Sequence, residues 1–99
     1  MKLCYFHPEA LREIDHAAAY YKDKQAGLET RFLEIVEDAA LRIQRNPLMY
    51  KRIEGELRKC RLPHFPYGLV FRIQAEQIEI IALMHLRQQP GYWQQGRLD

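Results

Sequence analysis

The chain has 99 residues and a mass of 11.9 kDa, which is enough for one domain and too little for two. Hydrophobic residues make up 47% of it and charged residues 28%, with only five Gly and five Pro, so the composition excludes a disordered or collagen-like chain. The longest apolar run, residues 80–84, is far shorter than the roughly 20 residues of a membrane span, and Met1–Lys2 is not followed by the apolar region that a secretory signal would need. We therefore expect one cytoplasmic domain over residues 1–99, without a membrane contact, in which Cys4 and Cys60 stay thiols.

The formal net charge of +2 is unevenly distributed along the chain. Residues 1–50 carry seven Lys/Arg against eight Asp/Glu, and residues 51–99 carry eight against five, so the balance changes from −1 to +3. A surface with one sign of charge attracts phosphates or acidic protein segments. The alternative is a solvated strand surface that Arg and Lys keep soluble, because a pI of 8.6 does not by itself indicate nucleic-acid binding.

The first half of the chain predicts a strand followed by two helices. An apolar run at residues 3–6 predicts a short strand that ends before Pro8. Proline suits the first helical position, and apolar residues then recur at three- and four-residue steps, so we expect a helix over about residues 8–22. Gly27 predicts a turn, and a second helix then runs from Leu28 to the Asn46–Pro47 stop. The short connection makes the two helices an antiparallel hairpin.

The second half predicts a three-stranded antiparallel meander over residues 56–62, 68–74 and 78–86. Residues 68–74 alternate in hydrophobicity, which is typical of a strand with one face on a core. Residues 78–86 are apolar on both faces for most of their length, so we expect this strand to be central. Residues 74–77 lack the Asn-Gly or Asp-Gly pair of a tight hairpin and predict a looser four-residue loop.

These elements predict an α+β fold in which the helical hairpin packs on one face of the sheet. Alternation assigns five strand residues to this helix-covered face: Leu69, Phe71, Ile80, Ala82 and Met84. It places His85 and Arg87 on the opposite face. Ile81 and Leu83 belong to that face too, and two layers leave it uncovered, so a basic and apolar surface is expected there.

Motifs for cofactor and metal chemistry are absent from the sequence. It contains no glycine-rich phosphate loop, no His-Glu-x-x-His and no Cys or His pair at zinc spacing, so we expect neither cofactor nor metal. The cysteines fall within predicted strands and do not suggest nucleophiles. The remaining candidate is a basic functional face, with these members: Arg58, Lys59, Arg61, Arg72, His85 and Arg87.

This basic set contains part of what RNA cleavage would require. Guanidinium groups can hold a phosphate and His85 could transfer a proton, but the second acid–base group would have to be Lys59, Glu54 or Glu56. The structural alternative is a strand-end His85 that hydrogen-bonds a neighbour. Arg58 and Arg61 would lie on opposite faces of a regular strand.

The aromatic pair Tyr92–Trp93 follows a turn at Pro90–Gly91. Such a pair is a natural anchor that folds a tail back onto the body of the domain. Stacking on a nucleobase is the alternative use for it.

The chain resembles the RelE/ParE superfamily of toxins from bacterial type II toxin–antitoxin systems over essentially its whole length. The resemblance rests on residues 6–10 (FHPEA), Tyr20–Tyr21, Gly27–Leu28 with Phe32, Asn46–Pro47, Arg61–Leu62 with residues 65–67 (FPY), and residues 85–93 (HLRQQPGYW). The last string is similar to the H-x-x-R-x-P-x-Y-W ending of ParE-like members, although His85 and Arg87 are here only two positions apart.

The resemblance implies a toxin that forms a hetero-oligomer with a cognate antitoxin, whose acidic segment folds on binding. ParE-type members act on DNA gyrase and block replication, whereas RelE-type members cut mRNA in the ribosome. The family's nucleases use Lys and Arg on the sheet face with a C-terminal Tyr; here Arg61, Arg87 and Tyr92 are approximate matches, with His85 as a further catalytic candidate. Because no convincing base accompanies them, the ParE-like branch is favoured. A relative that binds its antitoxin without being toxic is a third possibility.

Overall fold

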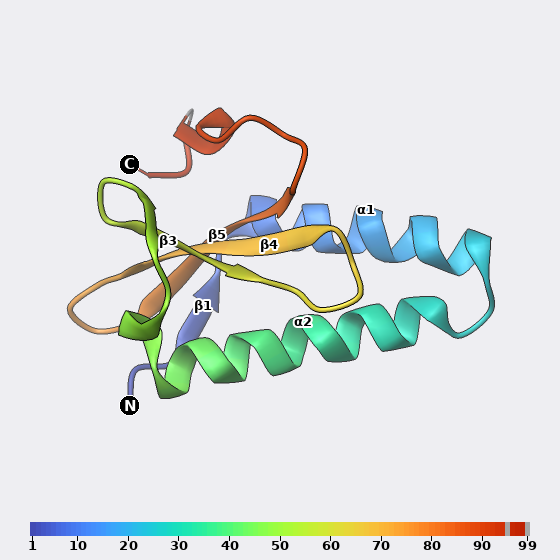
Figure 1. The fold of residues 1–99 in the computed structure, drawn as a ribbon, viewed down its shortest axis with the longest axis horizontal. Helices are drawn as coiled ribbons and strands as arrows, with labels where there is room; N and C mark the ends of the chain where they lie inside the picture. The colour runs from blue at the N-terminus through green and yellow to red at the C-terminus, as the bar shows by residue number, and fades with distance from the viewer. Residues whose placement is uncertain (95, 99) are drawn as a thin grey trace.

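The structure is a computed structural model that describes residues 1–94 and 96–98. Two helices pack on one face of a five-stranded sheet, as Figure 1 shows. The helices are α1 (Pro8–Lys24) and α2 (Leu28–Arg45), and the strands are β1 (Cys4–Phe6), β2 (Arg52–Glu54), β3 (Leu57–Arg61), β4 (Tyr67–Ile73) and β5 (Ile78–His85). Short 3-10 helices follow α2 (Pro47–Met49) and precede the C-terminus (Tyr92–Gln94). The predicted α+β fold is confirmed.

The helical hairpin has the predicted limits, with α1 extending to Lys24 rather than Lys22. His7 is an effective N-cap because its Nδ1 accepts a hydrogen bond from the Glu9 backbone N–H at 3.0 Å. Gly27 has a φ of 87°, a left-handed conformation that glycine adopts without a steric penalty, and α2 begins immediately after it.

The sheet has the order β1-β5-β4-β3-β2, so β5 is internal, as its apolar sequence predicts. Strands β2 to β5 form an antiparallel meander, and a four-residue connection, residues 74–77, joins β4 to β5. The sequence did not predict β2, because three residues are too few to show an alternating pattern. Strand β1 pairs with β5 in parallel, which makes the sheet mixed.

A β-bulge in β5 makes one part of the predicted alternation wrong. Val70 of β4 pairs with Ala82 and Phe71 pairs with Ile80, so Ile81 is the extra residue. Ile81 and Ala82 therefore both lie on the face away from the helices, and every later side chain of β5 changes face. Met84 packs away from the helices, and Leu83 packs beneath them.

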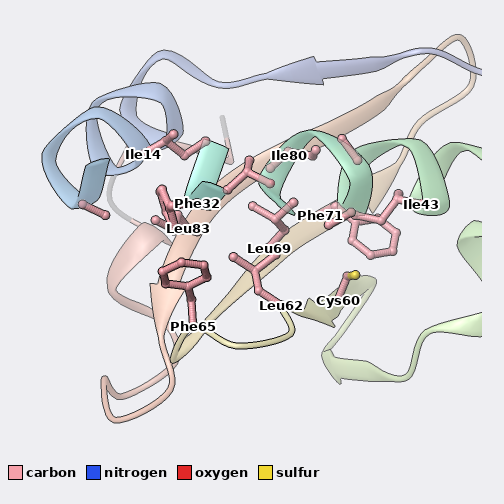
Figure 2. Packing of buried hydrophobic residues seen from close by; sticks show 14 of the residues in the cluster. Ile14, Phe32, Ile43, Cys60, Leu62, Phe65, Leu69, Phe71, Ile80 and Leu83 are labelled. Atoms are coloured by element: carbon pink, nitrogen blue, oxygen red, sulfur yellow. The ribbon is translucent and has the colours of Figure 1, made fainter. Parts of the chain in front are cut away.

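The main core lies between the helices and the sheet (Figure 2). Phe32 and Ile43 of α2 are fully buried against Leu69 and Phe71 of β4. At one end, Phe32 packs edge-on against Phe65, with ring centroids 5.1 Å apart. Side chains from both helices and from β3, β4 and β5 thus share one cluster, which fixes the helix layer on the sheet.

The opposite face of the sheet is covered by the C-terminal segment, so the predicted open face is wrong. Trp93 is fully buried in a second cluster with Leu57, Val70, Ile81, Ala82 and Met84. Figure 1 shows this segment, in red, on the side of the strands opposite α2. Two layers would have left an apolar sheet face in water, and the tail removes that exposure.

Candidate functional site

The strand register divides the predicted basic residues between the two faces of the sheet. Directly paired residues of antiparallel strands project to the same side. Lys59 pairs with Val70, and Arg61 pairs with Gly68, so both basic side chains belong to the tail-covered face. Arg58 pairs with Phe71, which faces the helices, and its guanidinium donates to the Tyr50 carbonyl at 2.6 Å. Arg58 and Arg61 therefore lie on opposite faces, as the sequence predicts for a regular strand.

Lys59, which is half-buried, and Arg61, which is exposed, form a basic strip on β3, on the same face of the sheet as the C-terminal tail. A Cβ atom on Gly68 would lie 2.9 Å from Cγ of Lys59, so the glycine leaves room for the lysine stem to lie against β4. Arg61 is exposed at the end of β3. Arg72 does not extend this strip freely, because its guanidinium binds Glu79 at 2.8 Å and also donates to the Leu98 carbonyl.

His85 lies on the helix side of the sheet, not on the face where alternation placed it. It lines a cleft together with Arg12, His16 and Ala17 of α1, because the bulge at Ile81 reverses the faces of all later residues in β5. The ring of His85 packs edge-on against Tyr67, with centroids 5.1 Å apart. Arg87 is exposed in the following turn, and its backbone N–H donates to His85 Nδ1 at 3.1 Å.

Tyr92 and Trp93 anchor the tail, which is the structural alternative considered from the sequence. The Tyr92 hydroxyl donates to the Leu83 carbonyl at 3.2 Å, and Leu98 packs against the same cluster as Trp93. Burial and the neighbouring Glu13 carboxylate raise the pKa of the Tyr92 hydroxyl above its usual value. The phenol is therefore held neutral and engaged within the fold.

Arg97 completes this anchor, and the sequence analysis missed it. Its guanidinium forms a bidentate pair with the Glu13 carboxylate of α1, at 3.0 and 3.1 Å, and also donates to the Ile81 carbonyl at 3.1 Å. The Glu13 carboxylate in turn accepts from the Leu83 backbone N–H at 3.0 Å. The paired side chains are 84 positions apart in the sequence, so no local pattern could have linked them.

The four catalytic candidates do not converge on one point. Arg61 and His85 belong to opposite faces, Arg87 is in the turn after β5, and Tyr92 is bonded to the Leu83 carbonyl. General acid–base catalysis requires two groups within hydrogen-bond reach of one substrate.

The two cysteines offer no reactive thiolate. Burial raises the pKa of the Cys4 thiol to about 11 and also raises the pKa of the Cys60 thiol, which keeps both thiols protonated and unreactive.

The described part of the chain contains neither a cluster of metal ligands nor a membrane-spanning helix. Among residues 1–94 and 96–98, no group of three or more His, Cys, Asp or Glu could hold a metal ion. Over the same residues, neither helix combines the length and the hydropathy that crossing a bilayer requires.

Comparison with known proteins identifies the family. A family model described as "ParE toxin of type II toxin-antitoxin system, parDE" matches residues 5–90. No curated protein matches the chain. A solved chain titled "Chromosomal ParDE TA system from P. aeruginosa" superposes with a TM-score of 0.63 and 16% identity, covering 86% of this chain and 96% of that chain. The helical hairpin, the meander and a family match over most of its length show that this chain belongs to the ParE toxin family of type II toxin–antitoxin systems.

Proposed function

We propose that this protein is the toxin of a toxin–antitoxin pair, that it acts in the cytoplasm on DNA gyrase, and that a cognate antitoxin neutralises it in a hetero-oligomer. Membership of the ParE family supports the toxin–antitoxin part. The observation that carries the choice of a protein target over RNA cleavage is the separation of Arg61 and His85 by the sheet. A ribonuclease needs groups that meet at one phosphate, whereas a protein-binding inhibitor needs only a surface.

The surface available for such a target includes the strip formed by Lys59 and Arg61. Both side chains project from β3 beside the anchored tail, and Arg61 is exposed. Paired with acidic groups of a target, such cations contribute mainly to the association rate and to specificity. A reversal of charge at Arg61 therefore tests the strip without disturbing the core.

The test is induced expression in bacteria, scored for growth arrest and for the superhelicity of a reporter plasmid. The proposal predicts arrest with altered supercoiling, relief on co-expression of the antitoxin, and inhibition of purified gyrase by the purified protein. The matched variants are Arg61→Glu, expected to weaken the inhibition, and Arg31→Glu on the exposed side of α2, expected to leave it unchanged.

Two alternative activities predict different results in the same experiment. A ribosome-dependent endoribonuclease would cut mRNA in translating ribosomes, and the cuts would disappear in His85→Ala and Arg87→Ala. A non-toxic relative would bind the antitoxin but cause neither arrest nor a change in supercoiling. Either result contradicts the proposal of a gyrase inhibitor.

A further inference from the structure

Gly68 of β4 differs from the other glycines of the chain, all of which lie within residues 1–94 and 96–98. The other four have a positive φ, which glycine adopts easily, and a Cβ added to them would meet nothing within 4 Å: Gly27, Gly55, Gly91 and Gly96. Gly68 has no such φ, but a Cβ there would lie 2.9 Å from Cγ and 3.0 Å from Cδ of Lys59. Glycine is otherwise unfavourable inside a strand. The missing side chain at this position therefore makes space for the lysine.

The stem of Lys59 extends toward Arg61. Lys59 pairs directly with Val70, whereas Gly68 pairs directly with Arg61. Since Cγ and Cδ of Lys59 lie beside Gly68, the stem runs diagonally, away from its own partner and along the strand. Arg61 is two positions further along β3, about 7 Å away from Cα to Cα, and projects to the same face. The direction of the stem thus brings the ammonium and the guanidinium toward each other.

Two neighbouring cations repel each other, and the described part of the fold supplies no anion between them. Like charges side by side on a sheet are destabilising. No ion pair among residues 1–94 and 96–98 includes Lys59 or Arg61. Residues 57–75 contain neither Asp nor Glu, and the Glu79 carboxylate on the same face is bound by Arg72. The two cations therefore present their donors to an acceptor from outside the fold.

From this arrangement we propose that Gly68 is a positioning residue that directs Lys59 toward Arg61, and that the two cations together bind one acidic side chain of the target protein. The inference rests on the function proposed above and adds which groups act as a unit and what holds them in place. A carboxylate has two oxygens, so it can accept from the ammonium and from the guanidinium at the same time. A nucleic-acid backbone is a poorer occupant, because it requires several cations that follow the strand.

The experiment uses the full chain and purified DNA gyrase. It measures the concentration that half-inhibits supercoiling and, by titration calorimetry, the Kd for gyrase without DNA. Gly68→Ala and Lys59→Ala are each expected to raise both values about fivefold, because one displaces the ammonium and the other removes it. The matched control is Lys51→Ala, which removes the same side chain at an exposed position before β2 and should change them about twofold or less. Circular dichroism and urea unfolding establish that each variant is folded.

Double variants distinguish positioning from packing. In Lys59→Ala there is no stem for a new Cβ to displace, so adding Gly68→Ala should cause no further loss of inhibition. A second cycle combines Lys59→Ala with Arg61→Ala. If both cations bind one carboxylate, the double variant should lose much less than the product of the two single losses. This second cycle does not depend on the folding of Gly68→Ala.

The outcomes separate the positioning role from the function itself. If the wild-type chain inhibits gyrase and Gly68→Ala inhibits equally well, or loses as much in the Lys59→Ala background, the positioning role is overturned while the function stands. Losses that simply multiply for Lys59→Ala and Arg61→Ala overturn the shared carboxylate. If these two variants weaken binding to a DNA duplex and not to gyrase, the contact is with phosphate and the inference is overturned. If the wild-type chain neither binds nor inhibits gyrase, both the function and the site are overturned.

Discussion

Trp93 is the single residue on which the C-terminal layer most depends. It is fully buried between the tail and the second sheet face, yet its indole Nε1 finds no hydrogen-bond acceptor in the described part of the chain. Leaving a buried N–H unpaired costs about 1–3 kcal/mol, so the apolar contacts of the ring must exceed that penalty. The Trp93 side chain therefore stabilises the tail through its buried apolar surface and not through a hydrogen bond.

Replacing Trp93 should be the most destabilising single substitution in the tail. We expect Trp93→Ala to lower the free energy of unfolding by roughly 3 kcal/mol, because it removes a large buried side chain and leaves a cavity. Trp93→Phe, which keeps a ring and removes the unpaired N–H, should lose much less. Urea unfolding followed by circular dichroism measures both. Leu48→Ala at an exposed site is the control, and equal stabilities for Trp93→Ala and Leu48→Ala would contradict the assignment.

The face of the sheet on which His85 lies depends on the β-bulge at Ile81, four positions earlier in the same strand. Strict alternation from Ile81 through Leu83 places it on the face away from the helices. The extra residue at Ile81 moves it to the α1 side, where it lines the cleft. A bulge leaves no distinct signature in an apolar run, so the sequence identified the residue but assigned it to the wrong face.

At the scale of the elements, the free edge of β5 is satisfied by side chains instead of by a neighbouring strand. Strand β1 pairs only with residues 78–80. Beyond it, Arg97 donates to the Ile81 carbonyl, Glu13 accepts from the Leu83 N–H, and Tyr92 donates to the Leu83 carbonyl. These contacts cover an edge that could otherwise pair with another chain.

Glu13 and Arg97 should therefore be energetically coupled, since their ion pair connects α1, β5 and the tail. A double-mutant cycle with Glu13→Ala and Arg97→Ala is expected to give a coupling energy of about 1–2 kcal/mol, because both side chains are largely buried and bidentate. The comparison pair is Arg52 with Glu56, which is exposed and 3.7 Å apart, and its coupling should be below about 0.5 kcal/mol. Equal coupling energies in the two cycles would show that the Glu13–Arg97 pair stabilises the fold no more than an exposed ion pair does.

At the scale of the whole molecule, an aromatic cluster joins the two helices to the sheet. Tyr21 of α1 packs against Phe32 of α2, Phe65 of the β3–β4 loop and Tyr67 of β4, with centroids 5.3, 4.8 and 6.4 Å away respectively. Burial, with a smaller contribution from Tyr67, raises the pKa of Tyr21 from 10.0 to about 12. The folded state therefore resists ionisation of this phenol.

Together with the raised pKa values of Tyr50 and Tyr92, this shift predicts that the fold loses stability at alkaline pH. In the unfolded chain Tyr21 ionises near its ordinary value of 10.0, whereas in the folded chain it stays protonated until about pH 12. Its contribution to stability is complete below about pH 10 and is lost as the pH rises toward 12. Circular dichroism and tyrosinate absorbance during an alkaline titration should show unfolding in this window. Tyr21→Phe should move the transition upward and Tyr20→Phe, at an exposed site, should not; an unchanged midpoint for Tyr21→Phe would refute the assignment.

The sequence by itself determined the elements whose signals are local. The three- and four-residue steps of residues 8–22, Gly27 before α2 and the Asn46–Pro47 stop each act within a few positions of the chain, so the helical hairpin was predicted correctly, as were three of the four strands of the meander, β2 being the exception. The family resemblance rested on the same local strings. The basic residues were also identified, because charge is a property of composition.

Only the tertiary structure decided how these residues are distributed in space. The face of His85 depends on the register of β5 against β4, and the cover over the second sheet face depends on Trp93 reaching strands that precede it in the chain. The contact of Glu13 with Arg97 joins residues 84 positions apart. Periodicity and capping are local properties of the backbone, whereas register, bulges and tail docking are set by the burial of apolar surface across the whole fold.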